Sequence, residues 1–208
     1  MQVTVYGASG KVGRLVVAKL LADQHTVVAF VHQRNPFAGQ TGVSVVSGSV
    51  DEPAAVALAA AGSQVLISTL GSWGTATKTV VSTGTQAIIA AAQKHHIGRV
   101  ITLTGASAFC NADTPTASDR LTHRLLSVLA PKILREGEQH LQLLEASTLD
   151  WTALRSPAML GFGAAKYQLV AKLPSLLATI PRRAVVQAII DQVLATDSSE
   201  QAPVIRRG

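Results

Sequence analysis

The sequence predicts an α/β fold: a doubly wound parallel sheet flanked by helices, with a small C-terminal segment. Three observations predict it. Short apolar runs alternate five times with helical patterns before residue 105, the connections are short, and glycines cluster where the first run ends. The 208 residues show neither a linker nor an internal repeat. We therefore expect a single domain over 1–208, with a core at 1–155 and a C-terminal segment at 156–208.

The first strand, 3–6, ends in a turn that carries three glycines, and an apolar helical pattern begins at once. One glycine lets the chain reverse, one lets backbone N–H groups approach a pyrophosphate, and one lets the helix pack on the strand. The first N–H groups of the helix and its dipole also favour phosphate. The alternative is an ordinary strand-to-helix turn of another α/β protein. We expect a dinucleotide to bind here, through Gly7, Ser9, Gly10, Lys11, Val12 and Gly13.

The second strand, 26–31, is followed by residues that indicate which dinucleotide binds. An Asp or Glu at the end of this strand would accept hydrogen bonds from the adenosine ribose and would repel a 2′-phosphate. Segment 32–36 instead contains Arg34 and no carboxylate. An arginine offers a planar fork of donors to a phosphate, and Lys11 or Arg14 adds charge nearby. The sequence therefore favours NADP(H) over NAD(H); the alternative for Arg34 is a solvated surface side chain.

Loops at the carboxyl ends of parallel strands line the cofactor crevice of such sheets. After the third strand, 43–47, we expect Asp51 to cap the Ala-rich helix 53–61 and to lie beside the adenine ring. The fourth strand, 65–70, runs into a loop of small residues and one tryptophan. The candidate contacts of this region are Asp51, Leu70, Gly71 and Ser72, with Trp73 and Gly74 in the same loop.

A long helix, whose apolar stripe runs from Val80 to Ala92, precedes the fifth strand, 100–104. Lys94, His95 and His96 are expected in its last turn, and Gly98 as its stop. The fifth strand ends at Thr104 and Gly105, which the same rule places at the crevice.

The second half of the chain begins with a polar loop. Residues 107–118 are rich in Ser, Ala, Thr, Asp and Pro and predict a mobile loop over the site. Helical periodicity runs from 121 to 129, breaks at Pro131 and resumes to 145. The remaining patterns predict a sixth strand at 149–155, a helix near 170–178, an amphipathic helix at 182–194, and a last strand at 204–205 before a basic tail.

Composition narrows the classes of protein that fit. The formal net charge is +6, but the basic residues are scattered and aromatic residues make up only 4%. We read this charge as an attraction for an anionic cofactor, because a nucleic-acid site would need a basic patch with interleaved aromatic residues. One cysteine, Cys110, excludes an internal disulfide and fits a reducing cytoplasm, and no metal-ligand cluster is expected. No apolar run is long enough to span a membrane, and the first strand begins too early for a signal peptide.

Four stretches together carry a family resemblance: Gly7–Gly13, Arg34–Pro36, Gly48–Asp51 and Leu149–Pro157. The chain resembles the atypical short-chain dehydrogenase/reductases, and within them the NAD(P)H-binding, NmrA-like group that includes biliverdin-IXβ/flavin reductases and small quinone reductases. The resemblance covers residues 1 to about 195. One departure is Ser156, which separates Arg155 from Pro157 where the family commonly has Arg-Pro together.

The resemblance implies a Rossmann domain that binds NADP(H), with a substrate cleft between the strand ends and the segment 156–208. Orthodox members of the superfamily use a Tyr-x-x-x-Lys pair, which is absent here, since the only tyrosines are Tyr6 and Tyr167 and neither has the lysine. Flavins and quinones can accept a hydride without such an acid, because water can protonate the product. We therefore expect a cytoplasmic NADPH-dependent oxidoreductase that acts on a small electron acceptor such as a quinone or flavin.

Thr104 is the candidate catalytic residue, because it occupies roughly the place of the superfamily's active-site serine; its alternative is a strand-end threonine without a role. Thr104, Gly105 and Pro157 are expected beside the nicotinamide. His123 and His140 lie on predicted helices near the cleft, where lone histidines are usually structural or solvated. The competing function is a non-catalytic NADP(H)-sensing regulator that binds a protein partner. The sequence leaves the oligomeric state open.

Overall fold

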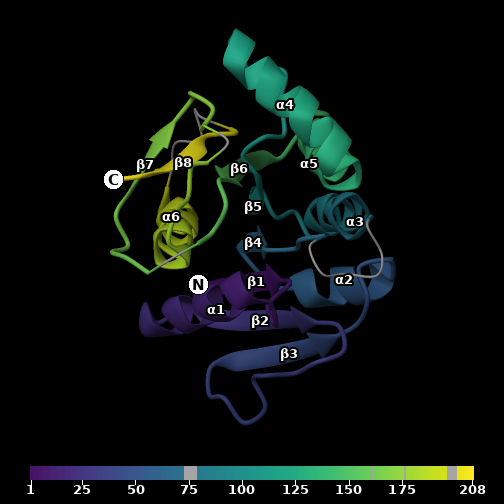
Figure 1. The fold of residues 1–208 in the computed structure, drawn as a ribbon. Coiled ribbons are helices and arrows are strands. Elements are labelled where there is room, and N and C mark those ends of the chain that lie inside the picture. Colours follow the sequence, from purple (N-terminus) through teal and green to yellow (C-terminus); the bar gives the residue numbers. More distant parts are fainter. Residues whose placement is uncertain (73–78, 161, 176, 196–200) are drawn as a thin grey trace.

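The computed structural model describes residues 1–72, 79–160, 162–175, 177–195 and 201–208, and within them one sheet contains every named strand (Figure 1). The strand order is β3-β2-β1-β4-β5-β6-β8-β7. All neighbours are parallel except β7 and β8, which are antiparallel. The strands are β1 Gln2–Tyr6, β2 Thr26–Val31, β3 Val43–Ser47, β4 Val65–Ser68, β5 Arg99–Gly105, β6 Asp150–Ser156, β7 Tyr167–Val170 and β8 Val204–Arg207.

Helices cover both faces of this sheet, which confirms the predicted doubly wound α/β architecture. α1 (Lys11–Ala22) and α6 (Arg182–Leu194) pack on one face, in an apolar core with the buried sides of β1 and β2. α2 (Pro53–Ala60), α3 (Val80–Lys94) and α5 (Pro131–Glu145) pack on the other. The chain winds outward from β1 in both directions, so the strand order reverses between β1 and β4, where such folds form their ligand crevice.

α5 is fixed on its sheet-facing side by two buried polar residues. The Glu136 carboxylate accepts hydrogen bonds from Ser82 N, at 3.1 Å, and from Ser82 Oγ, at 2.8 Å, and so caps the first turn of α3 from outside. One turn later, His140 is bonded to Thr85 and Thr102. Glu138 lies between these two in sequence and about 160° away around the helix, since successive residues are rotated by about 100°. It therefore faces away from α3.

α4 (Ala117–Leu129) is attached differently from the other helices. All 13 of its residues keep part of their surface exposed, and its neighbour is α5 (Figure 1). Its start is set by a capping box, in which the Thr116 side chain and the Asp119 carboxylate each bond the other's backbone N–H. Its outer face is an apolar stripe, whose large exposed side chains are Leu121, Leu125, Val128 and Leu129.

Two expectations for the end of the chain are wrong. Residues Tyr167–Val170 form β7, and the described residues from 171 to 178 lie outside any helix. The basic tail is part of β8, where Arg206 pairs with Gln168 and Arg207 with Tyr167. At the start of the predicted helix, Val170 pairs with Val204 of β8, and further along Pro174 disfavours a helix at the residue before it.

Two helix boundaries also differ from the predictions. The N-cap of α2 is Glu52, not Asp51, and the Glu52 carboxylate accepts a hydrogen bond from Ser49 N at 3.2 Å. α3 ends at Lys94 with His95 as its C-cap. His96, with φ of 54°, takes the left-handed conformation that ends the helix, so Gly98 is not the stop. The break at Pro131 between α4 and α5 is confirmed.

Candidate functional site

In the turn after β1, neighbouring backbone atoms leave no room for a Cβ at two glycine positions. Gly7 has φ of +73°, and a Cβ there would lie 3.0 Å from the backbone of Thr69, at the end of β4. A Cβ on Gly13 would lie 2.3 Å from the carbonyl oxygen of Gly7. Gly10 N donates to the same carbonyl at 3.0 Å. These positions therefore require glycine, as the predicted close approach of helix and turn demands.

The N-terminus of α1 is open toward the same edge of the sheet. Its N-cap is Gly10, and within the described residues no side chain caps it and no acidic residue lies in its first turn. Lys11 is exposed, whereas the Val12 side chain is buried in the core, so Val12 offers only its backbone N–H. Ser9 is half-buried beside them. Unpaired N–H groups and the positive end of the helix dipole give this turn the chemistry of a phosphate site.

The end of β2 presents Arg34 to solvent. Its guanidinium makes neither a hydrogen bond nor an ion pair with any described residue, so it is available to a ligand. The exposed Asp51 lies near His32, and hydrogen bonds from Ser49 and from its own backbone lower the pKa of its carboxyl group. It thus stays ionised near neutral pH, while the N-cap position expected for it is taken by Glu52, whose side chain makes no capping hydrogen bond.

The ends of β4, β5 and β6 lie side by side with the glycine turn. Thr69 Oγ1 donates to the carbonyl oxygens of Tyr6 and Gly7, which ties the end of β4 to the end of β1. Leu70 is half-buried, Gly71 is exposed and Ser72 is buried. Trp73 and Gly74 lie outside the described residues.

Thr104 stands opposite Arg155 in the β5–β6 register, and Gly105 stands opposite Ser156. Pro157 directly follows Ser156. The predicted residues Thr104, Gly105 and Pro157 therefore lie at the same edge of the sheet. The hydroxyl of Thr104 is directed toward α5, where a Cβ built on Gly137 would lie 3.2 Å from it. The predicted contacts thus follow the ends of six strands, β1 to β6, and their roles stay predictions.

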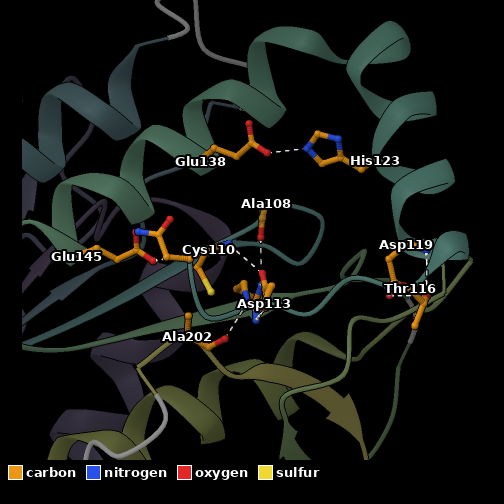
Figure 2. Close-up of polar contacts among 11 residues, drawn as sticks. Ala108, Cys110, Asp113, Thr116, Asp119, His123, Glu138, Glu145 and Ala202 are labelled. Atoms are coloured by element: carbon orange, nitrogen blue, oxygen red, sulfur yellow. Dashed lines mark hydrogen bonds and ion pairs between the residues drawn. The ribbon is translucent and has the colours of Figure 1, made fainter.

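The loop after β5 is held down by a buried ion pair that the sequence did not reveal. Arg155 is 1% exposed, and its two terminal nitrogens bond the carboxylate oxygens of Asp113 at 2.6 and 2.8 Å. Its Nε donates to the carbonyl of Ala202 at 2.8 Å and its Nη1 to that of Ala108 at 3.2 Å. Figure 2 shows Asp113 surrounded by Ala108, Cys110 and Ala202. Residues 107–116 are therefore anchored to β6 and to the segment before β8.

Two hollows lie beside this loop. A small pocket with about 10 Å³ of free volume, room for about one water molecule, lies at the end of β5 between α4 and residues 173–174. A groove of about 540 Å³ lies next to it and shares Asp119 and Leu173 with it. The small pocket is lined by Ala106, Ser107, Phe109, Asp119, Thr122, His123, Leu173 and Pro174. The groove includes Cys110, Asp113, Trp151, Arg155 and Lys172.

The titratable groups near these hollows differ in what they can do. Hydrogen bonds from Thr116 lower the pKa of Asp119, which stays ionised. Burial raises the pKa of the Cys110 thiol, which disfavours the reactive thiolate. His123 Nε2 lies 2.6 Å from Glu138 Oε1 (Figure 2). The His123 ring also stacks on Phe109, with centroids 4.4 Å apart. This pair was not predicted, because its members lie 15 residues apart on different helices.

His140 and the two tyrosines have structural surroundings. His140 is 1% exposed, its two ring nitrogens are bonded to Thr85 Oγ1 at 2.6 Å and to Thr102 Oγ1 at 2.9 Å, and burial lowers its pKa to about 4. Tyr6 donates to the carbonyl of Val56, and burial raises its pKa. Tyr167 donates to Asp191, and burial and this carboxylate raise its pKa. None of the three is suited to donate a proton in the crevice near neutral pH.

The described residues contain no cluster of three or more His, Cys, Asp or Glu side chains that could hold a metal ion. Among the same residues, no helix has both the length and the apolar character that a membrane span requires.

Comparison with known proteins gives a consistent result. A family model described as NAD(P)H-binding matches residues 7–196. The 2-alkyl-3-oxoalkanoate reductase of Stenotrophomonas maltophilia (strain K279a) is 29% identical over 128 residues, which are 59% of this chain and 36% of that protein. The chain thus matches little more than a third of the length of this curated relative.

Two solved structures show the same fold over nearly the whole chain. ChuY, an anaerobilin reductase from Escherichia coli O157:H7, has a TM-score of 0.80 at 24% identity and covers 100% of this chain and 97% of its own. A short-chain dehydrogenase/reductase from Veillonella parvula DSM 2008, solved in complex with NADP, has a TM-score of 0.77 at 21% identity and covers 99% of this chain and 94% of its own.

Proposed function

Because the chain belongs to the NAD(P)H-binding family of atypical short-chain dehydrogenase/reductases, we propose that it is an NADPH-dependent reductase of a small electron acceptor such as a quinone or flavin. The observation that carries the proposal is the turn after β1. Its glycines admit no Cβ at Gly13, and the first N–H groups of α1 have no side-chain cap among the described residues. This backbone fits a pyrophosphate, because unpaired N–H groups at a helix N-terminus bind anions.

In this proposal, residues at several strand ends bind different parts of the dinucleotide. The first turn of α1 binds the pyrophosphate, with Ser9 and Lys11 beside it. Arg34 binds the phosphate on the adenosine ribose, since it is exposed and has no partner among the described residues. Asp51, Leu70 and Gly71 flank the adenine and ribose side.

The reaction itself takes place at the ends of β5 and β6. When bound, the reduced dinucleotide supplies a hydride. Thr104 holds a carbonyl or amide oxygen with its hydroxyl, while Gly105 and Pro157 flank the nicotinamide. In this proposal residues 1–155 bind the dinucleotide, and residues 156–208 close the cleft over the acceptor. Close stacking of donor and acceptor supplies most of the rate enhancement.

The first experiment follows the absorbance of NADPH with menadione and with FMN as acceptors, and with NADH as the control donor. NADPH oxidation with either acceptor supports the reductase. Tight NADPH binding without oxidation across the panel would contradict it and would favour the sensing regulator instead.

Cofactor choice is tested by the dissociation constants of NADPH and NADH for Arg34→Ala. Loss of charge-assisted hydrogen bonds to a phosphate is expected to weaken NADPH about 10-fold or more and to leave NADH unchanged. Arg183→Ala, an exposed arginine on α6, is the matched control. An unchanged NADPH constant together with equally tight NADH would refute the NADP(H) assignment.

One observation favours the sensing regulator as a second candidate. The outer face of α4 exposes Leu121, Leu125, Val128 and Leu129, a stripe of the kind through which helices dock on partners. A regulator needs such a surface, whereas a reductase does not. Turnover with NADPH separates the two functions.

A further inference from the structure

We propose that His123 is the proton donor to the acceptor in this reductase, and that Glu138 positions its ring. The inference rests on the proposed function and adds a catalytic residue to it. His123 lines the small pocket at the end of β5, together with Ala106 and Ser107, the two residues that directly follow that strand. The pocket therefore lies where the strand ends bring donor and acceptor together.

The geometry of the pair suits a histidine that delivers a proton. Glu138 Oε1 accepts a hydrogen bond from His123 Nε2 at 2.6 Å, and this is the only hydrogen bond of the ring within the described residues. Nδ1 is thus left without a hydrogen-bond partner among the described residues, and the Glu138 carboxylate orients the ring through Nε2. Stacking on Phe109, which lines the same pocket, holds the plane of the ring.

The fold explains why Glu138 faces this histidine. Glu136 and His140 hold the opposite side of α5 against α3 through buried hydrogen bonds. Glu138 therefore projects toward α4, as Figure 2 shows. The side chains of His123 and Glu138 are 27% and 29% exposed, so water can reprotonate the ring after each turnover.

The other ionisable groups around the pocket are poor donors. The ionisable residues that line the pocket are His123 and Asp119, one turn earlier on α4; Glu138 contacts His123, and Lys172 lies near Asp119. The Asp119 carboxylate is held ionised by Thr116, and Glu138 is occupied by the histidine. A histidine is also the side chain whose ordinary titration lies near neutral pH.

The step balances with a hydride and one proton. The hydride, with its electron pair, goes to the acceptor, which is reduced. The Nδ1–H bond of His123 breaks, its proton goes to an oxygen or nitrogen of the acceptor, and the ring is left neutral until water returns a proton. The substrate class is therefore an acceptor that gains a hydride and a proton and that lies beside this water-sized pocket rather than in it, such as a quinone or a conjugated carbonyl compound.

The test compares His123→Gln and Glu138→Gln with the wild type, using NADPH and menadione. General acid catalysis contributes about 100-fold or more, so His123→Gln is expected to lower kcat by about that factor. Glu138→Gln is expected to lower it by about 10-fold, because the ring loses its orientation and charge partner. The NADPH dissociation constant should stay within about twofold in both variants, since neither residue contacts the phosphate turn. Exogenous imidazole should restore part of the activity of His123→Ala.

A readout without the cofactor is the Hε1 NMR resonance of His123, which should shift when menadione is added to the protein alone. His25→Gln is the matched control, because His25 precedes β2 at the opposite edge of the sheet. A wild-type enzyme that turns over while His123→Gln matches its kcat at every pH would refute this inference alone. If the wild type fails to oxidise NADPH whichever acceptor is supplied, the proposed function is refuted, and this inference with it.

Discussion

The turn after β1 and the loop after β5 lie at the same edge of the sheet, yet they are held by opposite means. The turn is shaped by backbone contacts around Gly7 and Gly13 and leaves the N–H groups of α1 open. The loop is held by side-chain charges, through Arg155 on Asp113 and through Glu145, which accepts hydrogen bonds from Asn111. The first arrangement offers backbone N–H groups to a phosphate, whereas the second shapes a pocket with side chains.

The largest expected effect comes from breaking the charge anchor of the loop. Arg155→Met leaves the Asp113 carboxylate buried without a partner, which is expected to lower the free energy of unfolding by about 3–5 kcal/mol. Urea unfolding measures this loss. The double variant Arg155→Met/Asp113→Leu is the control, because an apolar pair of similar volume restores most of the stability. Equal stability of the single variant and the wild type would show that the anchor is dispensable.

The second effect is the pH dependence that the buried His140 gives to the free energy of unfolding. His140 is neutral in the fold with a pKa of about 4, whereas in the unfolded chain it binds a proton below about 6.5. The unfolded state therefore binds more protons between these pH values, and the free energy of unfolding falls as the pH is lowered, by about 1.4 kcal/mol per pH unit. The full window corresponds to roughly 3 kcal/mol.

Urea midpoints at several pH values across this window measure the slope. The glutamine of His140→Gln can still bond Thr85 and Thr102 but does not titrate. The urea midpoint of this variant should therefore change less with pH than that of the wild type over the same range. A wild-type slope that survives in His140→Gln would assign the effect to another group.

The third effect breaks the backbone turn. Gly13→Ala places a Cβ 2.3 Å from the Gly7 carbonyl oxygen, so α1 must shift away from the turn. Overpacking of this kind costs about 1–3 kcal/mol, and the displaced N–H groups should lose most of their affinity for NADPH. Calorimetric titration measures that affinity. Gly98→Ala is the matched control, because its Cβ would meet open space; equal NADPH binding by both variants would contradict the assigned role of the turn.

The same comparison explains which parts were predictable from the sequence. The glycine turn, the first five strands and the break at Pro131 follow from patterns within a few residues, because glycine, proline and apolar runs act locally. β7 was missed, and a helix was predicted from its last residue, Val170, onward, because only pairing with the distant β8 marks this segment as a strand. Asp113 and Glu138 were missed for the same reason: their partners lie 42 and 15 residues away. Long-range charge pairs leave no local pattern.

The smallest effect tests whether the start of α4 depends on its own cap or on the pocket beneath it. Thr116→Ala removes the hydroxyl that accepts from Asp119 N and donates to the Asp119 carboxylate. Loss of such a cap costs about 1 kcal/mol, and because every residue of α4 is partly exposed, the loss should appear as local fraying rather than global unfolding. Amide hydrogen exchange should therefore quicken in the first turn of α4 and stay unchanged in α5. Thr116→Ser, which keeps the hydroxyl, is the control. Faster exchange throughout α5 would instead mean that α4 and α5 unfold as one unit, and that the pair formed by His123 and Glu138 stabilises both helices.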